Sequence, residues 1–409
     1  MRNIFLFCLL FLAACQTIPA PKGIAAHYKT QLQEPALGTI RVNTFISYDS
    51  LFGRFARVGQ QLISAPESST IGFPYSGKLA NKIRYHVDSP THLQVMLPMQ
   101  WEARPQLAGI SAGTVAAKSI VSVNLQLSGR TLASYRIEDL RLKNQWTEKP
   151  VVKVMGFPVQ VGGLVDQVVV SKLPTLSMDL KTQLNQWLVP NQVSSLFNLG
   201  FALPSGIVAD PLAFDVHDLA FLPTGLQGNL LVQSRLHVGS TLKSSLVRPV
   251  YLPLVLADNQ MTFGVYLTLD EIRTMLAAQL KTDVSQIDLK VNEKMQDFEC
   301  GVSDRGSVRM RIHFIPVLID DKSIGIQVNS IELGSLGLMK SIFSGSIKRK
   351  IVRGIHSQRM NTDQLISRLP TDFQGIQATN LRIRLDSIYY SKDMVQVLGK
   401  LAGDWTLRK

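Results

Sequence analysis

Long stretches of this chain alternate apolar and polar residues, which is the pattern of half-buried β-strands. In residues 92–101, HLQVMLPMQW, apolar side chains stand at every second position from Leu93, and in residues 120–127, IVSVNLQL, they do so from Val121. Residues 308–314, VRMRIHF, repeat the pattern, with the apolar residues facing inward and Arg309, Arg311 and His313 facing solvent. These segments predict a large antiparallel sheet that buries one face.

Helical spacing of apolar residues is found in a few segments only. Residues 47–63 and 268–281 each follow a predicted strand directly, and the second of these helices begins with a capping box from Thr268 to Glu271. A further helix is predicted in each half, at residues 177–188 and at residues 335–356. The order of strand, helix, sheet and helix therefore occurs twice.

The two halves also share residues in the same order. Residues 45–51 align with residues 266–272, and Asp215 and Asp386 are each followed 13 residues later by a glycine, Gly228 and Gly399. We therefore expect an α+β fold of two related tandem modules, each a long curved antiparallel sheet wrapped around one or two helices. The expected modules are residues 39–245 and residues 246–409.

Residues 1–14 have the layout of a secretory signal peptide, with Arg2, an apolar run and two small residues. The run is too short to span a bilayer, which takes about 20 apolar residues. Leu12-Ala13-Ala14-Cys15 resembles the lipobox of bacterial lipoproteins. The resemblance implies cleavage before Cys15, attachment of acyl chains such as palmitate to that residue and, because Gln16 follows, anchoring in the outer membrane facing the periplasm. The alternative is an ordinary signal with a chance cysteine.

Residues 15–38 show no hydrophobic period, and Pro19, Pro21 and Pro35 interrupt any helix. This composition predicts a lipidated N-terminus and a tether, with folding beginning near Thr39. No later apolar stretch is long and unbroken enough to predict a transmembrane helix.

The chain is basic and apolar, with a formal charge of +13 and 18% charged residues. In the periplasm, a basic protein is expected to meet anionic lipid or lipopolysaccharide, and no nucleic acid partner is expected. One amphipathic helix is a candidate for contact with an anionic surface through Lys348, Arg349, Lys350 and Arg353. The alternative is the solvated face of a helix that packs on its own sheet.

Motifs for catalysis are weak. Ser111 lies in a GISAG sequence that fits a nucleophile elbow, but a strand is predicted after it where that motif needs a helix. The seven histidines have no spacing typical of a metal site. Cys300 is expected to be a small buried residue without a disulfide partner, since Cys8 leaves with the signal and Cys15 carries lipid. The sequence therefore predicts a protein that is not an enzyme and has no metal or cofactor.

The tandem plan resembles the tubular lipid-binding (TULIP) superfamily, which includes bactericidal permeability-increasing protein, over residues 39–409. The chain also resembles bacterial envelope lipoproteins of a domain-of-unknown-function family. The superfamily resemblance implies an elongated apolar tunnel that shields acyl chains. The inward residues of two predicted strands would line it, namely Leu93, Val95, Leu97, Val308, Met310 and Ile312.

The expected function is binding or carrying of lipid or another hydrophobic ligand by a lipid-anchored periplasmic protein. The alternative is a non-enzymatic structural or interaction lipoprotein, whose modules have filled cores and dock to other envelope proteins.

Overall fold

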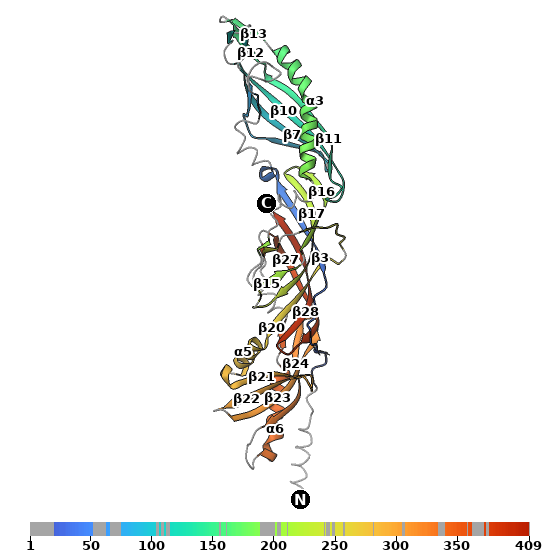
Figure 1. Cartoon of the computed structure of the whole chain (residues 1–409), viewed down its shortest axis with the longest axis vertical. Coiled ribbons are helices and arrows are strands. Elements are labelled where there is room, and N and C mark those ends of the chain that lie inside the picture. Colours follow the sequence, from blue (N-terminus) through green and yellow to red (C-terminus); the bar gives the residue numbers. More distant parts are fainter. Residues whose placement is uncertain are drawn as a thin grey trace, which may run out of the picture.

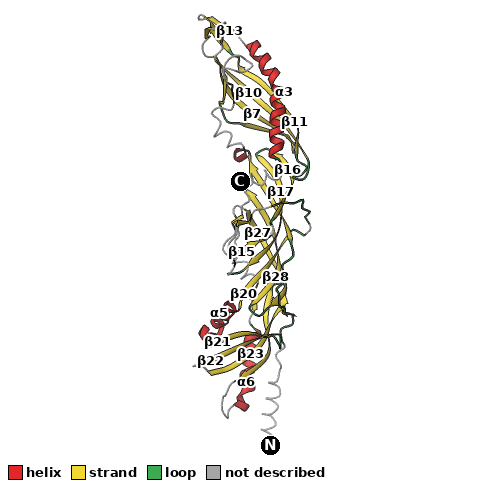
Figure 2. Ribbon diagram, viewed as in Figure 1, coloured by secondary structure: helices red, strands yellow, loops and turns green. Residues whose placement is uncertain are grey.

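The computed structural model describes residues 20–408, apart from residues 52–62, 66–74, 104–105, 108–109, 112–114, 155–156, 161, 189–200, 203–205, 211, 241, 243–245, 248–249, 257, 281, 305–306, 334–339, 358, 362–371 and 374–375. In parts of several elements only the backbone is described. The molecule is long and narrow, with one sheet near each end and a third sheet between them (Figure 1). Strands dominate, and the helices lie against the two end sheets (Figure 2).

The first end sheet has the strand order β11-β10-β7-β5-β4, with β6 also paired to β7. Two short hairpins, β8 with β9 and β12 with β13, and the long helix α3 belong to the same part of the chain. The bounds are β4 (Ile63–Ala65), β5 (Tyr75–Leu79), β6 (Arg84–Ser89), β7 (His92–Ala103), β8 (Gln106–Leu107), β9 (Ile110–Ser111), β10 (Val115–Ser128), β11 (Arg136–Glu148), β12 (Val151–Val154), β13 (Phe157–Gln160) and α3 (Gly162–Trp187).

The central sheet takes strands from both halves of the chain, in the order β19-β16-β17-β20-β3-β28-β27-β2. Strand β15 adds to β17 and β26 adds to β27, while β14 and β18 form a separate pair. The bounds are β2 (His27–Tyr28), β3 (Gly38–Ser47), β14 (Phe201–Ala202), β15 (Ile207–Ala209), β16 (Ala213–Leu222), β17 (Gly225–Val238), β18 (Leu246–Val247), β19 (Val250–Tyr251), β20 (Gln260–Thr268), β26 (Asp372–Phe373), β27 (Ile376–Tyr390) and β28 (Met394–Arg408).

The second end sheet has the order β21-β22-β23-β24-β25, and β1 adds to β23. Helix α5 contacts β21 and helix α6 contacts β24. The bounds are β1 (Ile24–Ala25), α5 (Leu269–Leu280), the 3-10 helix η1 (Val284–Gln286), β21 (Ile287–Asn292), β22 (Asp297–Asp304), β23 (Ser307–Asp320), β24 (Ser323–Leu333), α6 (Lys340–His356) and β25 (Arg359–Asn361). The predicted α+β class with long curved antiparallel sheets and few helices is confirmed.

The strand order of the central sheet reads alike from its two edges. From one edge it runs β19-β16-β17-β20 and from the other β2-β27-β28-β3. Each run has a parallel pair at the edge, then an antiparallel hairpin, then a parallel pair. Longer antiparallel pairings also join β17 to β3 and β20 to β28, so the sheet is mainly antiparallel and contains four short parallel pairs. The boundary between residues 245 and 246 stays a prediction.

The predicted tether, residues 15–38, includes residues that belong to the folded body. Ile24 and Ala25 pair with β23, Ala26 is buried, and the backbone nitrogen of Gln33 donates to Oε1 of Gln396 at 3.1 Å. Residues 24–37 therefore pack on the body, because backbone pairing needs no hydrophobic period. Residues 1–19, with Cys15, lie outside the described residues.

Helices α3, α5 and α6 lie in three of the four predicted regions, with one large error in length. Helix α5 begins with the predicted capping box, in which the Thr268 nitrogen donates to Glu271 Oε2 at 2.8 Å and the Glu271 nitrogen donates to Thr268 Oγ1 at 3.2 Å. Helix α3 begins at Gly162 and not at residue 177, because Pro174 lies inside the helix without ending it. Residues 48–51 are helical, but residues 52–62 are not described, so the equivalence of this helix with α5 stays a prediction.

Candidate functional site

The predicted lining residues of β7 lie on the inner face of the first end sheet. Leu93 and Val95 are buried and belong to the main hydrophobic core. Leu97 is only half-buried, and so is Val121, which lies directly opposite it on β10. Met99, the next inward residue of β7, is buried again, so Leu97 and Val121 form a less buried position within this face.

Helix α3 is fastened to the open edge of this sheet by polar side chains. Asn185 Oδ1 accepts from the backbone nitrogen of Ile137 at 2.6 Å, and its Nδ2 donates to the carbonyl of the same residue at 3.2 Å. Lys181 Nζ donates to the carbonyl of Glu138 at 2.6 Å, and Ser177 Oγ accepts from the nitrogen of Leu142 at 3.2 Å. These side chains recur every four residues on one helix face, so α3 covers the edge of β11 and blocks further pairing there.

The second end sheet is filled by large side chains. Ile312 is buried opposite Cys300, and Met310 is half-buried opposite Val302. The rings of Phe298 and Phe314 stack with their centroids 5.4 Å apart, and the centroid of Phe298 lies 4.9 Å from that of Tyr390. Tyr390 also contacts the ring of Tyr28 edge-on. The side chain of Val308, the other predicted lining residue, lies outside the described residues.

His313 was predicted to face solvent, and that prediction is wrong. The residue is 6% exposed, and its Nδ1 lies 3.3 Å from Oδ1 of the buried Asp297. Nδ2 of Asn329 donates to the other oxygen of this carboxylate at 3.3 Å. The alternation of β23 was read correctly, but its second face is also covered at this point, which alternation alone does not reveal.

Cys300 is a buried thiol within the described part of the chain, as predicted. Burial raises its pKa to about 11, with a smaller contribution from the charge of Asp288. A thiol with such a pKa is almost fully protonated at neutral pH and is a poor nucleophile.

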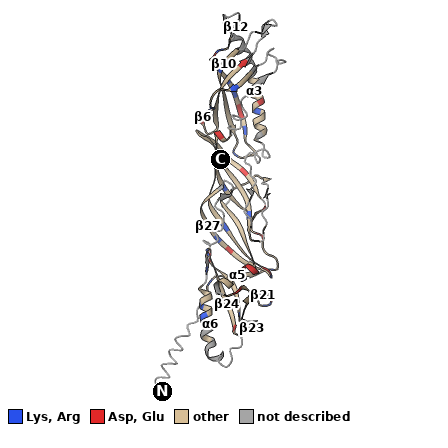
Figure 3. Cartoon of the chain, turned by 90° about the vertical axis from the view of Figure 1, so that its left-hand side faces the viewer, with Lys and Arg blue, Asp and Glu red and all other residues tan. Residues whose placement is uncertain are grey.

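Helix α6 presents the predicted basic residues at the end of the molecule opposite α3 (Figure 3). Ile351, Val352 and Ile355 pack against the main core, whereas Lys350 and Arg353 are exposed. Lys348 and Arg349 are half-buried. The apolar face of the helix is thus used by its own sheet, and only the basic face is available to a partner.

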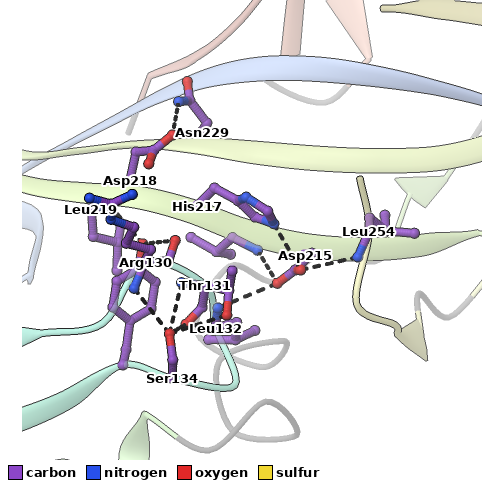
Figure 4. A network of polar contacts seen from close by, with 12 residues as sticks. Arg130, Thr131, Leu132, Ser134, Asp215, His217, Asp218, Leu219, Asn229 and Leu254 are labelled. Carbon is purple, nitrogen blue, oxygen red and sulfur yellow. Dashed lines mark hydrogen bonds and ion pairs between the residues drawn. The ribbon is translucent and has the colours of Figure 1, made fainter. Parts of the chain in front are cut away.

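A buried carboxylate joins the first end sheet to the central sheet, and sequence reasoning missed it. Asp215 on β16 is 1% exposed and accepts from the backbone nitrogens of Val216 at 2.8 Å, Leu254 at 3.1 Å and Leu132 at 3.4 Å (Figure 4). Nε2 of His217 lies 2.9 Å from its Oδ2. The bonds link β16 to the turn after β10 and to the segment after β19. The available signal was an Asp between the apolar residues Phe214 and Val216 of one strand.

A metal site is not assembled by the described residues. They contain no group of three or more His, Cys, Asp or Glu side chains that could hold a metal ion. Ser111 ends the two-residue strand β9, its side chain is not described, and the residues after it lie outside the description. Among the helices described, none has both the length and the apolar character needed to cross a bilayer.

Comparison with known proteins finds similarity to solved structures. No family model matches this chain, and no curated protein matches it. A crystal structure of lipopolysaccharide binding protein is similar over 92% of this chain and 100% of that chain, with a TM-score of 0.26 and 11% sequence identity. The fold described here rests on the strand pairing of the chain itself.

Proposed function

We propose that this protein is an outer-membrane lipoprotein that binds or carries a lipid or another hydrophobic ligand in the periplasm. The supporting observation is the inner face of the first end sheet, where Leu97, Val121, Leu125 and Leu142 lie in mid-strand and yet are only half-buried. Mid-strand residues of a close-packed core are normally fully buried. Accessible apolar surface at these positions is suited to an acyl chain, whose burial contributes about 0.8 kcal/mol per methylene.

The proposal is tested by native mass spectrometry of the full chain carrying Cys15→Ser, so that no covalent lipid is present. We expect lipid masses to remain bound after gentle purification, and delipidated protein to take up a fluorescent fatty acid above the level of a control protein. Absence of both signals would refute ligand carriage. It would favour the second candidate, an interaction lipoprotein with filled cores, which the packing of Phe298 and Phe314 supports.

The proposed anchor places the second end sheet close to the membrane. Cys15 lies nine positions before Ile24 in the chain, so the anchor lies at most about 30 Å from β1. A row of paired residues then runs across the sheet from Ala25 through Val317 and Gly325 to Arg359, just beyond α6. Three strand spacings span about 14 Å. The basic face of α6 is therefore within reach of the lipid headgroups.

Charge also favours an anionic lipid surface as the partner of α6. Residues 333–362 contain six Lys or Arg and no Asp or Glu. Each cation near an anionic membrane contributes about 1 kcal/mol. We propose that Lys348, Arg349, Lys350 and Arg353 rest on the headgroups of the membrane that holds the anchor, with the α3 end pointing away from it.

Removal of two of these cations should weaken the membrane contact strongly. In the full chain with Cys15→Ser, we expect loss from the membrane fraction and weak, salt-sensitive flotation with phosphatidylglycerol vesicles. Adding Lys350→Gln and Arg353→Gln should lower that affinity about 25-fold, since 1 kcal/mol corresponds to about fivefold. The control Lys143→Gln with Lys149→Gln removes equal charge from exposed positions of the first end sheet and its flank. Equal losses in both variants would contradict the contact through α6.

A further inference from the structure

An amide group that has no partner in the described part of the chain lies on the inner face of the first end sheet. Asn144 of β11 is paired with Val121, which is paired in turn with Leu97, and these residues share one face. Its Oδ1 and Nδ2 each expose less than 1 Å² and have no hydrogen-bond partner among the described residues. The amide therefore lies in the same row as the half-buried apolar residues that support ligand binding.

Two nearby polar side chains, in contrast, have hydrogen-bond partners. Ser119 on the inner face of β10 is buried and accepts from Nε1 of Trp101 at 2.8 Å. Asn185 of α3 bonds both backbone groups of Ile137. Buried polar groups in folded proteins are nearly always paired, and an unpaired amide destabilises the protein that holds it. Asn144 offers one acceptor and two donor hydrogens to something other than the described chain.

The surroundings of Asn144 restrict the chemistry of what it would bind. The neighbouring inward positions are Leu142 and Trp146 on the same strand and Val121 and Leu97 across the sheet, and none of them is charged. A phosphate or a carboxylate would lose its hydration there without gaining a countercharge. A neutral carbonyl or hydroxyl group of a ligand can form hydrogen bonds with the amide. The hydrocarbon of the same ligand can then pack against the apolar residues of this row.

We propose that Asn144 binds the neutral polar group of an acylated ligand, an ester carbonyl or a hydroxyl, while the acyl chain lies along Leu97 and Val121. This inference rests on the proposed ligand-binding function and specifies its ligand class. The amide sets the position of the ligand along the sheet, because hydrocarbon alone slides freely over an apolar surface.

The test compares two probes of similar chain length, 1-monooleoylglycerol and 1-octadecene. Delipidated full chain carrying Cys15→Ser is incubated with each probe, and the bound probe is extracted and measured by gas chromatography. We expect Asn144→Leu to lower the affinity for 1-monooleoylglycerol about tenfold and to leave 1-octadecene unchanged or better bound. The same variant should raise the Tm of the ligand-free protein by a few degrees, because it removes an unpaired buried amide.

The matched control is Asn124→Leu, the same chemical change on the outer face of the neighbouring strand β10. It should leave the ratio of the two affinities unaltered. Asn144→Val serves if Asn144→Leu does not fold. An unchanged preference for 1-monooleoylglycerol in a folded Asn144 variant would overturn the inference while leaving ligand carriage intact. Uptake of neither probe by the wild type would overturn the proposed function as well.

Discussion

Asp215→Ala should lower the free energy of unfolding by about 3–5 kcal/mol, the usual effect of breaking a buried charged network. The substitution removes the acceptor of three backbone N–H groups, those of Leu132, Val216 and Leu254, and the partner of His217. The N–H groups of Leu132 and Leu254 belong to segments outside β16, so both lose a bond that holds them to the central sheet. Urea unfolding followed by circular dichroism measures the change.

The chain supplies a control for this experiment in Asp386, the residue that matches Asp215 in the other half of the sequence. The side chain of Asp386 is 34% exposed and pairs with Arg384, itself 68% exposed, at 3.4 Å. Ion pairs with this much solvent contribute about 0–1 kcal/mol. Asp386→Ala should therefore be nearly neutral. Comparable losses of unfolding free energy in the two variants would show that the Asp215 network does not stabilise the contact between the first end sheet and the central sheet.

The contrast between these two aspartates shows where sequence reasoning stops. Their positions match because each precedes a glycine by 13 residues in an antiparallel hairpin, and this relation is local. Their surroundings differ because the turn at Leu132 and the segment at Leu254 reach only Asp215. Contacts between distant segments are not encoded in the spacing of residues along one strand.

Local patterns did predict much of the fold. Alternation located β7, β10 and β23, and the capping box located α5, because side-chain direction in strands and helices repeats at fixed intervals. The start of α3 at Gly162 was missed because only the apolar face of residues 177–188 was recognised as helical. The burial of His313 was missed because the second covering layer comes from elsewhere in the chain.

The sequence predicted which residues of one strand share a face of the candidate site, but not how neighbouring strands surround them. The sequence indicated that Leu93, Val95 and Leu97 share an inner face, which follows from the period of two. It did not indicate that burial decreases from Leu93 to Leu97, or that Asn144 lies in the row of Leu97. The latter depends on the register of three strands, which is set by β7, β10 and β11 together.

Leu97→Trp should lower lipid uptake at least fivefold and change the Tm little, if the half-buried row has room for a ligand. Tryptophan adds volume in the space that an acyl chain would occupy. If it prevents the burial of only two methylenes, at about 0.8 kcal/mol each, the affinity for the lipid falls more than tenfold. The measurements are fluorescent fatty acid binding and thermal unfolding of the same delipidated protein.

Leu93→Trp is the control variant for Leu97→Trp. Leu93 lies on the same strand and the same face but is 2% exposed, within the main core. A larger side chain there must overpack, which destabilises a protein by about 1–3 kcal/mol. A stable Leu97→Trp beside an unstable Leu93→Trp therefore requires free space at Leu97. If both variants lose stability alike, the interior at Leu97 is already filled by protein, and the row is a core and not a ligand site.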